Sequence, residues 1–392
     1  MNWAPIWALP NIELDEPVES DFFALVPNND PRVSKVKKDH SEFRRFIGQF
    51  TNTFGIRLSP CLILRRTDAP ERVMTAEAAA SFRDLLAASM APYAQARNIA
   101  HQNTHHGADY SSFFWVHPWT TNRDYSYISA ITPTISAVHR AKTFRGQSSP
   151  DLSPTSVRRG DFDEPLLQEL LTKWDARYNI DSPPWDVRAL FRSLNMSNQA
   201  LLFPGGVDAT IHDFGRIAAL WVASFEILIH PGGDGRANLT RVLELLDRVP
   251  WINRRLGHRR YRVRIRNQFS NRNLACWLYR ELYTCRNDFL HGNPVNIGNL
   301  RIQQSGRGLV PFGSILYRLA LTSFLDLSFR DELPPPSQAE AFAAHVSERM
   351  NFEQPQKKVE EALLLARVSE EEQRRRRDEV IQNRRVRTKR VS

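Results

Sequence analysis

The hydrophobic pattern of this chain changes at a polar stretch near residue 150, and this change sets the fold class. Before it, apolar residues form short runs rich in aromatic and β-branched side chains, a pattern typical of strands. After it, apolar residues recur at helical spacing almost without a break. The stretch itself, residues 146–165, is rich in serine, proline and charge and predicts a linker. The sequence therefore predicts an α+β amino-terminal domain followed by an all-α domain.

The amino-terminal domain is expected to alternate strands with two helices. The predicted strands are 22–27, 56–64, 111–119 and 125–131, and the predicted helices are 41–54 and 75–101. The first helix follows from phenylalanine and isoleucine residues at helical spacing, and the second contains Pro92, which predicts a kink.

The second half is expected to be a set of helices closed by prolines. The predicted helices are 164–176, 185–202, 213–230, 238–248, 271–291 and 313–327. Three consecutive prolines at 334–336 cannot continue a helix, so they end this domain. Further helices are predicted at 339–350 and 355–386. The resulting division is 1–150 for the mixed α/β domain, 151–185 for the linker and lead-in helix, 186–330 for the helical domain, and 331–392 for the proline linker, charged helix and basic tail.

The net charge of +10 is concentrated in two places. Residues 374–390 hold nine Arg or Lys and two acids, which gives 9 − 2 = +7 in the tail alone. A terminal charge run of this kind is usually solvated, although it could also bind nucleic acid. The second basic run lies between Trp251 and Arg280, where nine arginines occur and no Asp or Glu.

The cysteines and the start of the chain indicate a cytoplasmic protein. Three cysteines without a CxxC pair (Cys61, Cys276 and Cys285) favour a reducing compartment. The first residues contain prolines and acids where a signal peptide needs an unbroken apolar core. No run of about 18 uncharged apolar residues occurs, so no membrane span is predicted.

The sequence RNDFLHGN (286–293) ends the apolar helical pattern that begins near Leu274. A histidine can move protons near neutral pH, and a guanidinium can hold phosphate oxygens in a bidentate manner. RNA can be cleaved by attack of its own 2′-hydroxyl, which needs proton transfer and stabilisation of negative charge on the phosphate. His291 and Arg286 are therefore candidates for metal-free RNA cleavage.

At these residues the sequence resembles the HEPN superfamily, and within it the Apea-like branch. The motif is an arginine, a polar residue directly after it and a histidine a few positions on, here Arg286, Asn287 and His291. The helical stretch 216–229, with Glu226 inside it, resembles the central helix of that branch. The resemblance covers roughly residues 186–330 and finds no counterpart in the amino-terminal half.

The resemblance implies an HEPN-like helical bundle that forms a homodimer and acts as a metal-independent endoribonuclease. Its products would carry 2′,3′-cyclic phosphate and 5′-hydroxyl ends. His291 is the expected acid or base, Arg286 the phosphate clamp, and Asn287 the residue that orients the histidine, with Glu226 and Asp288 in support. Such proteins are often tied to phage defence or to toxin–antitoxin systems, so an antitoxin or regulatory partner is a further expectation.

Helix geometry leaves an alternative open. Residues five apart on a helix differ by about 140° around the axis, so Arg286 and His291 do not share a face, whereas Asn287 and His291 do. A single Arg/His pair does not easily supply both acid and base, but two chains could. Alternatively, Arg286 pairs with Glu226 inside the bundle and the motif is structural, which would leave a non-catalytic RNA-binding or assembly module.

Two further patterns bear on the site. Arginines alternate with apolar residues from 260 onward (Arg260, Arg262, Arg264 and Arg266), which fits either an RNA-binding track or an ordinary exposed strand. Three histidines, His101, His105 and His106, have spacing that could suit zinc, but the sequence offers no further ligands nearby, and a polar helix end is the favoured interpretation. We expect neither a metal nor a cofactor.

Overall fold

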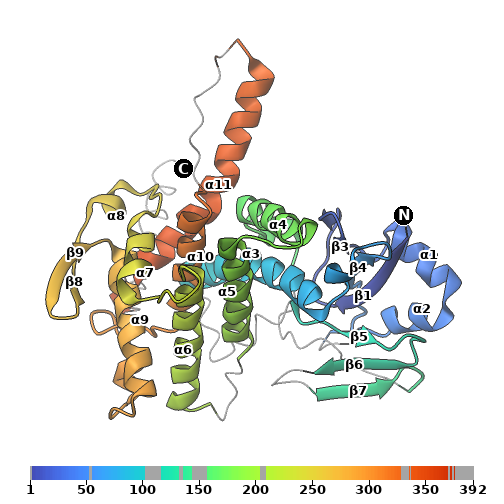
Figure 1. Ribbon diagram of the computed structural model, residues 1–392, viewed down its shortest axis with the longest axis horizontal. Coiled ribbons are helices and arrows are strands. Elements are labelled where there is room, and N and C mark those ends of the chain that lie inside the picture. The colour runs from blue at the N-terminus through green and yellow to red at the C-terminus, as the bar shows by residue number, and fades with distance from the viewer. Residues whose placement is uncertain are drawn as a thin grey trace, which may run out of the picture. The chain divides into compact units, whose positions relative to one another are not determined.

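The computed structural model describes residues 2–52, 55–101, 116–131, 136–143, 157–203, 209–327 and 337–369, together with residues 335, 371, 372 and 375. They form two compact units (Figure 1). The first unit draws on Met1–Ala94, His105–Ala209 and Ala223–Ala237, and the second on Gln95–Thr104, Thr210–Val222 and Asn238–Ser392. Segments distant in sequence therefore join within each unit. Within the described residues, no helix is long and apolar enough to cross a membrane.

The first unit contains an antiparallel sheet with the strand order β1-β4-β3-β2. Its strands are β1 (Trp3–Leu9), β2 (Val18–Glu19), β3 (Phe23–Val26) and β4 (Cys61–Arg66). The two central strands are more buried than the edge strand β1, and β3 is buried along its whole length. Pro5 lacks a backbone N–H and lies in the edge strand β1, where the register with β4 shifts between Pro5 and Trp7. An edge position with a register shift is where a sheet tolerates proline.

Two short helices and a second small sheet share a core with this sheet. The helices are α1 (Pro31–Asp39) and α2 (Ser41–Ile47), and the strands, in the order β5-β6-β7, are β5 (Thr120–Thr121), β6 (Tyr127–Ile131) and β7 (Ser136–Arg140). Phe43, Phe46 and Phe50 pack with Trp119 in this core. Trp119 and Ala8 exchange two backbone hydrogen bonds, of 2.7 and 2.9 Å, which tie β1 to the segment before β5.

The remaining elements of the first unit are helical. They are the 3-10 helices η1 (Glu71–Val73) and η3 (Arg159–Asp161), the first part of α3 (Ala76–His101), α4 (Glu164–Asn179), α5 (Trp185–Leu202) and the last part of α6 (Ile211–Leu228). Trp174 of α4 is fully buried and packs edge-on against Phe23 and Phe82. Its indole N–H donates to Ser81 Oγ at 2.9 Å, so the buried polar atom is satisfied. This cluster joins α3, α4 and the sheet.

The second unit is mostly helical. It contains the first part of α6, then α7 (Leu239–Asp247), α8 (Arg254–His258), β8 (Tyr261–Ile265), β9 (Gln268–Arg272), α9 (Leu274–Leu290), η4 (Ile297–Leu300), α10 (Phe312–Phe324) and α11 (Ala339–Leu365). Asparagine side chains accept backbone N–H groups at the starts of α7, α8 and α9, as expected for good N-caps. Helix α10 is buried along almost its whole length and forms the centre of this unit.

Buried polar side chains connect α11 to the rest of the second unit. Glu360, which is 2% exposed, accepts the backbone N–H groups of Ile252 and Asn253 at 2.9 and 2.7 Å. Arg318 of α10 is 1% exposed and donates to Gln356 of α11. Because charged groups are rarely buried without partners, these bonds fix where α11 packs.

The structure agrees with the coarse prediction of a sheet-containing amino-terminal region followed by mostly helical chain, and α3, α5 and α6 lie close to their predicted ranges. Two predictions were wrong. The helix expected at 41–54 already ends at Ile47, before Gly48. Residues 339–365 form one helix that runs through Pro355, and 366–369 are not helical. Strand β1 was not predicted. Residues 111–115, 144–156, 204–208 and 376–392, which include parts of the predicted strand, linker and tail, lie outside the described residues.

Candidate functional site

The carboxyl end of α9 is a tightly specified turn. His291 is the C-cap and donates its backbone N–H to Asn287 O at 3.0 Å. Gly292 follows with φ +70°, a conformation that glycine adopts without the strain of a side chain. The Asn293 N–H then reaches back to Asp288 O at 3.1 Å, which completes a Schellman motif. The turn therefore leaves the His291 side chain exposed at the helix end.

Arg286 and Asn287 form one hydrogen-bonded pair. Arg286 Nη1 donates to Asn287 Oδ1 at 2.9 Å, and its guanidinium carbon lies 5.8 Å from the centre of the Tyr283 ring. Both residues of the pair are half-buried. The Asn287 side chain was expected to orient His291, but its hydrogen bond is made with Arg286. This contact restricts the guanidinium and leaves His291 to be placed by the backbone turn.

Asp288 organises the loop after α9. Its two carboxylate oxygens accept from the side-chain amides of Asn293 and Asn299, at 3.1 and 3.2 Å. Asn299 lies in η4, so Asp288 joins the helix end to the next element of the chain. The predicted support of the catalytic residues by Asp288 stays a prediction.

The first part of α6 packs closely against the end of α9. A Cβ atom on Gly215 would lie 2.3 Å from the Phe289 ring, so only glycine permits this approach. The exposed His212, one turn earlier on α6, meets the same Phe289 ring edge-on, with ring centres 6.3 Å apart. A second histidine therefore stands beside the end of α9. It escaped the sequence reasoning because only Glu226 had been singled out on this helix.

Strands β8 and β9 form a hairpin (Figure 1). Its arginines lie on one face. Along β8, Tyr261 and Val263 are buried, whereas Arg262 and Arg264 are exposed. Arg260, just before the strand, is exposed as well, and two-residue spacing gives it the same face as Arg262 and Arg264. Arg266 lies in the turn with φ +52°. The predicted arginine run is thus an exposed strand with its turn.

Phe269 on β9 was missed by the sequence reasoning. It lies opposite Arg264 in the hairpin, so it shares the arginine face, and it is 56% exposed. The Arg262 guanidinium carbon stacks 3.9 Å from the centre of its ring. A two-residue turn at Arg266 and Asn267 could have predicted this position, because it pairs Arg264 with Phe269 and so puts both side chains on the same face.

The hairpin is attached to α9. Arg280 Nε donates to Arg264 O at 2.8 Å. From Arg280 to His291 is eleven residues, or about 16 Å along a helix axis. The hairpin and the motif therefore lie on neighbouring elements of the second unit, joined at Arg280.

Glu226 lies in the part of α6 that belongs to the first unit. It is half-buried and lines a cavity of about 250 Å³ together with Trp185, Arg192 and His230. Its expected partnership with Arg286 stays a prediction.

The cysteines do not offer a nucleophile. All three are buried free thiols, and burial raises the pKa of Cys61 and of Cys285 to about 12 and raises the pKa of Cys276 as well. A thiolate is the reactive form, so none of the three is poised for attack near neutral pH.

Within the described residues, no group of three or more His, Cys, Asp or Glu side chains is placed to hold a metal ion. His105 and His106 lie outside those residues, as does the side chain of His101. In comparisons with known proteins, no family model, no curated protein and no solved structure matches the chain.

Proposed function

We propose that the chain is a metal-independent endoribonuclease of the HEPN type, as its resemblance to the Apea-like branch implies. The observation that supports this most is the end of α9. The Schellman turn exposes His291, while Asn287 holds the guanidinium of Arg286 a few residues away. These are the two chemical groups that cleavage of RNA without a metal requires.

In the proposed reaction the 2′-hydroxyl oxygen attacks the adjacent phosphorus as its proton passes to a base. The P–O5′ bond breaks, and the leaving oxygen takes a proton from an acid. The products are a 2′,3′-cyclic phosphate and a 5′-hydroxyl. Arg286 donates to the phosphate oxygens, where charge-assisted bidentate bonds are strongest, and His291 transfers one of the protons.

Two sources could supply the second proton-transfer group. One is His212, which meets Phe289 at the end of α9 in the same chain. The other is His291 of a second copy, in the homodimer that the resemblance implies. Leu290 and Ile297 next to the motif are 56% and 58% exposed, which suits burial against a second copy. The resemblance also associates such an enzyme with phage defence or a toxin–antitoxin system, with an antitoxin or another regulator as its partner.

The hairpin favours a polymeric nucleic acid as the substrate. Arg260, Arg262 and Arg264 can neutralise successive phosphates, and the exposed Phe269 ring can stack on a base. The same face would serve equally in a protein that binds RNA without cutting it. Non-catalytic RNA binding, with Arg286 and His291 structural, is therefore the second candidate function.

Cleavage of a labelled single-stranded RNA in the presence of a chelator separates the two candidates. For the enzyme, His291→Ala should lower the cleavage rate by about 10²–10⁴-fold, the usual contribution of an acid or base. His258→Ala is the matched control because His258 is also an exposed histidine near a helix end. If wild type leaves RNA intact and both variants bind it equally well, the non-catalytic function is correct.

His212→Ala then identifies the second proton-transfer group. A loss of rate comparable with that of His291→Ala would assign the role to His212. An unchanged rate would favour His291 of the second copy. An excess of His291→Ala chains added to wild type should then lower the activity, because the mixed dimers hold one histidine instead of two.

A further inference from the structure

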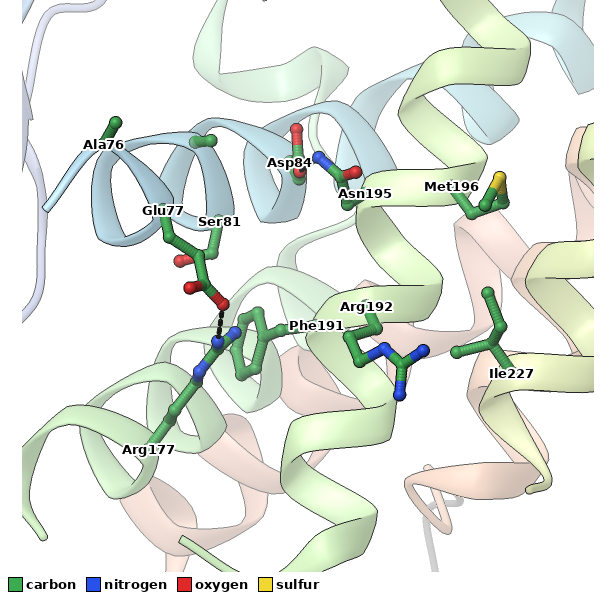
Figure 2. A pocket seen from close by; sticks show the side chains of 11 residues that line it. Ala76, Glu77, Ser81, Asp84, Arg177, Phe191, Arg192, Asn195, Met196 and Ile227 are labelled. Atoms are coloured by element: carbon green, nitrogen blue, oxygen red, sulfur yellow. Dashed lines mark hydrogen bonds and ion pairs between the residues drawn. The ribbon is translucent and has the colours of Figure 1, made fainter. Parts of the chain in front are cut away.

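The first unit contains a cavity of about 500 Å³ whose walls come from four helices (Figure 2). Helix α3 contributes small residues at Ala76, Ala80 and Ser81, which leave the space open. Phe191 and Met196 of α5 and Ile227 of α6 give it an apolar wall. The volume lies within the range of about 300–1,000 Å³ that is usual for small-molecule sites.

The acidic groups that line this cavity are already neutralised. Glu77 of α3 forms an ion pair of 2.5 Å with Arg177 of α4, drawn as a dashed line in Figure 2. Asp84 is 1% exposed, pairs with Arg83 at 2.6 Å, and accepts from the Asn195 amide at 2.9 Å. Neither carboxylate therefore leaves the cavity with uncompensated negative charge.

Arg192 provides the cationic group of the cavity. In Figure 2 its guanidinium extends from α5 toward Ile227 of α6. The Arg192 guanidinium carbon lies 5.7 Å from the centre of the Trp185 ring. Within the described part of the chain, Arg192 has no ion pair and no hydrogen-bond acceptor. Its five N–H donors therefore remain available to a ligand.

A second cavity of about 250 Å³ shares Arg192 and Ile227 with the first. Glu226 and His230 both line it, and Glu226 has an interaction partner of its own. His230 Nδ1 accepts the backbone N–H of Gly232 at 3.1 Å. That nitrogen therefore carries no proton, and Nε2 is the donor of the neutral ring. The His230 carbonyl accepts the Trp185 indole N–H at 2.6 Å, which fixes the ring against which Arg192 stacks. The two cavities thus place the exposed Arg192 and a histidine donor next to an apolar wall.

We propose that these joined cavities bind a small organic anion, with its carboxylate or phosphate on Arg192 and His230 and its apolar body along Met196 and Ile227. An anion satisfies the N–H donors of Arg192 with charge-assisted bonds, whereas a neutral ligand does not. Lined by a few polar groups and a longer apolar wall, the space matches the usual composition of small-ligand sites. The site belongs to the first unit and does not depend on the nuclease proposal.

Calorimetric titration of the full chain with hexanoate, pentyl phosphate and the neutral hexanamide tests the site. The three probes share one apolar body, so the comparison isolates the anionic head and tells carboxylate from phosphate. At least one anion should bind at least about tenfold more tightly than hexanamide, as expected for a charge-assisted bond.

Two arginine variants make the test specific. Arg192→Gln should weaken anion binding by about tenfold to a hundredfold. Arg188→Gln is the matched control, since Arg188 is exposed on the same helix and stacks on the same Trp185 ring but lines neither cavity. Equal binding of hexanamide and both anions would overturn the proposal. The proposal would also be wrong if Arg192→Gln has an unchanged melting temperature and binds the anions as tightly as wild type does. The same holds if none of the probes binds at about 10 mM.

Discussion

The cavity at Arg192 and the hairpin face beside α9 both rest on arginine, but they differ in shape and in the neighbours of the charge. Arg192 stands at the junction of two concave spaces of about 500 and 250 Å³. The carboxylates of the larger space, Glu77 and Asp84, have their own cations, and Glu226 lines the smaller space. Arg262 and Arg264 lie on an exposed strand in a segment with no acid from Trp251 to Arg280. A single cation in a concave site suits one small anion, whereas a row of cations along an open strand suits a polymer of phosphates.

The difference arises from local structure. On α5, neighbouring residues point in different directions, so Arg192 lines the cavity while Ser193 beside it is buried in the core. On β8, alternate residues share a face, so a simple alternation of arginine with tyrosine and valine produces a continuous basic row. The type of backbone therefore decides whether arginines act singly or together.

The largest effect is expected at Arg286. Arg286→Lys keeps the positive charge but loses the planar fork that holds a phosphate. Under the nuclease proposal the cleavage rate should fall about 10²–10³-fold. Arg188→Lys makes the same chemical change on a helix of the first unit and should cleave RNA at the wild-type rate. If the Arg286→Lys variant cleaves at the wild-type rate, any cation suffices at this position and the proposed role of Arg286 as a bidentate phosphate clamp is contradicted.

A smaller effect is expected from the hairpin arginines as a group. Replacing Arg260, Arg262 and Arg264 by alanine should weaken single-stranded RNA binding and reduce the slope of log K against log salt by about 2, at about 0.7 per phosphate contact. Fluorescence anisotropy at several salt concentrations measures both quantities. In the control variant, Lys35, Lys38 and Arg57, which are exposed in the first unit, are replaced by alanine. This variant loses the same amount of positive charge as the hairpin variant. Equal salt slopes for the two variants would show that RNA responds to the net charge of the protein and does not bind specifically at the hairpin face.

Phe269 tests whether the hairpin contacts bases as well as phosphates. Stacking of a base on an aromatic side chain contributes about 1–3 kcal/mol, so Phe269→Ala should weaken RNA binding about fivefold or more without changing the salt slope. Phe269→Tyr should bind as wild type does because it keeps the ring. If both variants bind RNA equally well, the ring serves only as a support for Arg262.

The smallest effect concerns the packing that places the motif. Gly215→Ala would force a Cβ atom into the Phe289 ring, and overpacking of this kind costs about 1–3 kcal/mol. A melting temperature lower by a few degrees is expected in calorimetry. Gly257→Ala is the control, because its Cβ would meet Trp251 at an ordinary 3.5 Å. Adding Phe289→Ala should make the Gly215 substitution nearly harmless, and fully additive losses would contradict the contact.

The sequence predicted the elements whose signals are local. The apolar spacing of α5 and α6 and the glycine after His291 were enough to place these helices and the end of α9. The edge strand β1 was missed because Pro5 argues against a strand, and only its pairing with β4 reveals it. Helix α11 continues through Pro355, where contacts of buried Gln356 and Glu360 with the second unit outweigh the lost hydrogen bond.

The candidate sites divide in the same way. Arg286, Asn287 and His291 are adjacent in sequence, and so are the hairpin arginines, so their patterns were visible. His212, Phe269 and Arg192 acquire their importance from contacts with other elements: the Phe289 ring, the opposite strand, and the walls formed by α3 and α6. Nothing in the sequence around any of the three distinguishes it from an ordinary surface residue.

The most direct test of the nuclease proposal is the chemistry of the RNA ends. A single-stranded RNA is incubated with the full chain and a chelator, and its products are identified by mass spectrometry beside those from the same RNA with 2′-O-methyl groups. Attack by the 2′-hydroxyl predicts 2′,3′-cyclic phosphate and 5′-hydroxyl ends from the first RNA and no cleavage of the second. Products with 5′-phosphate ends, cleavage of the methylated RNA, or intact RNA throughout would contradict it.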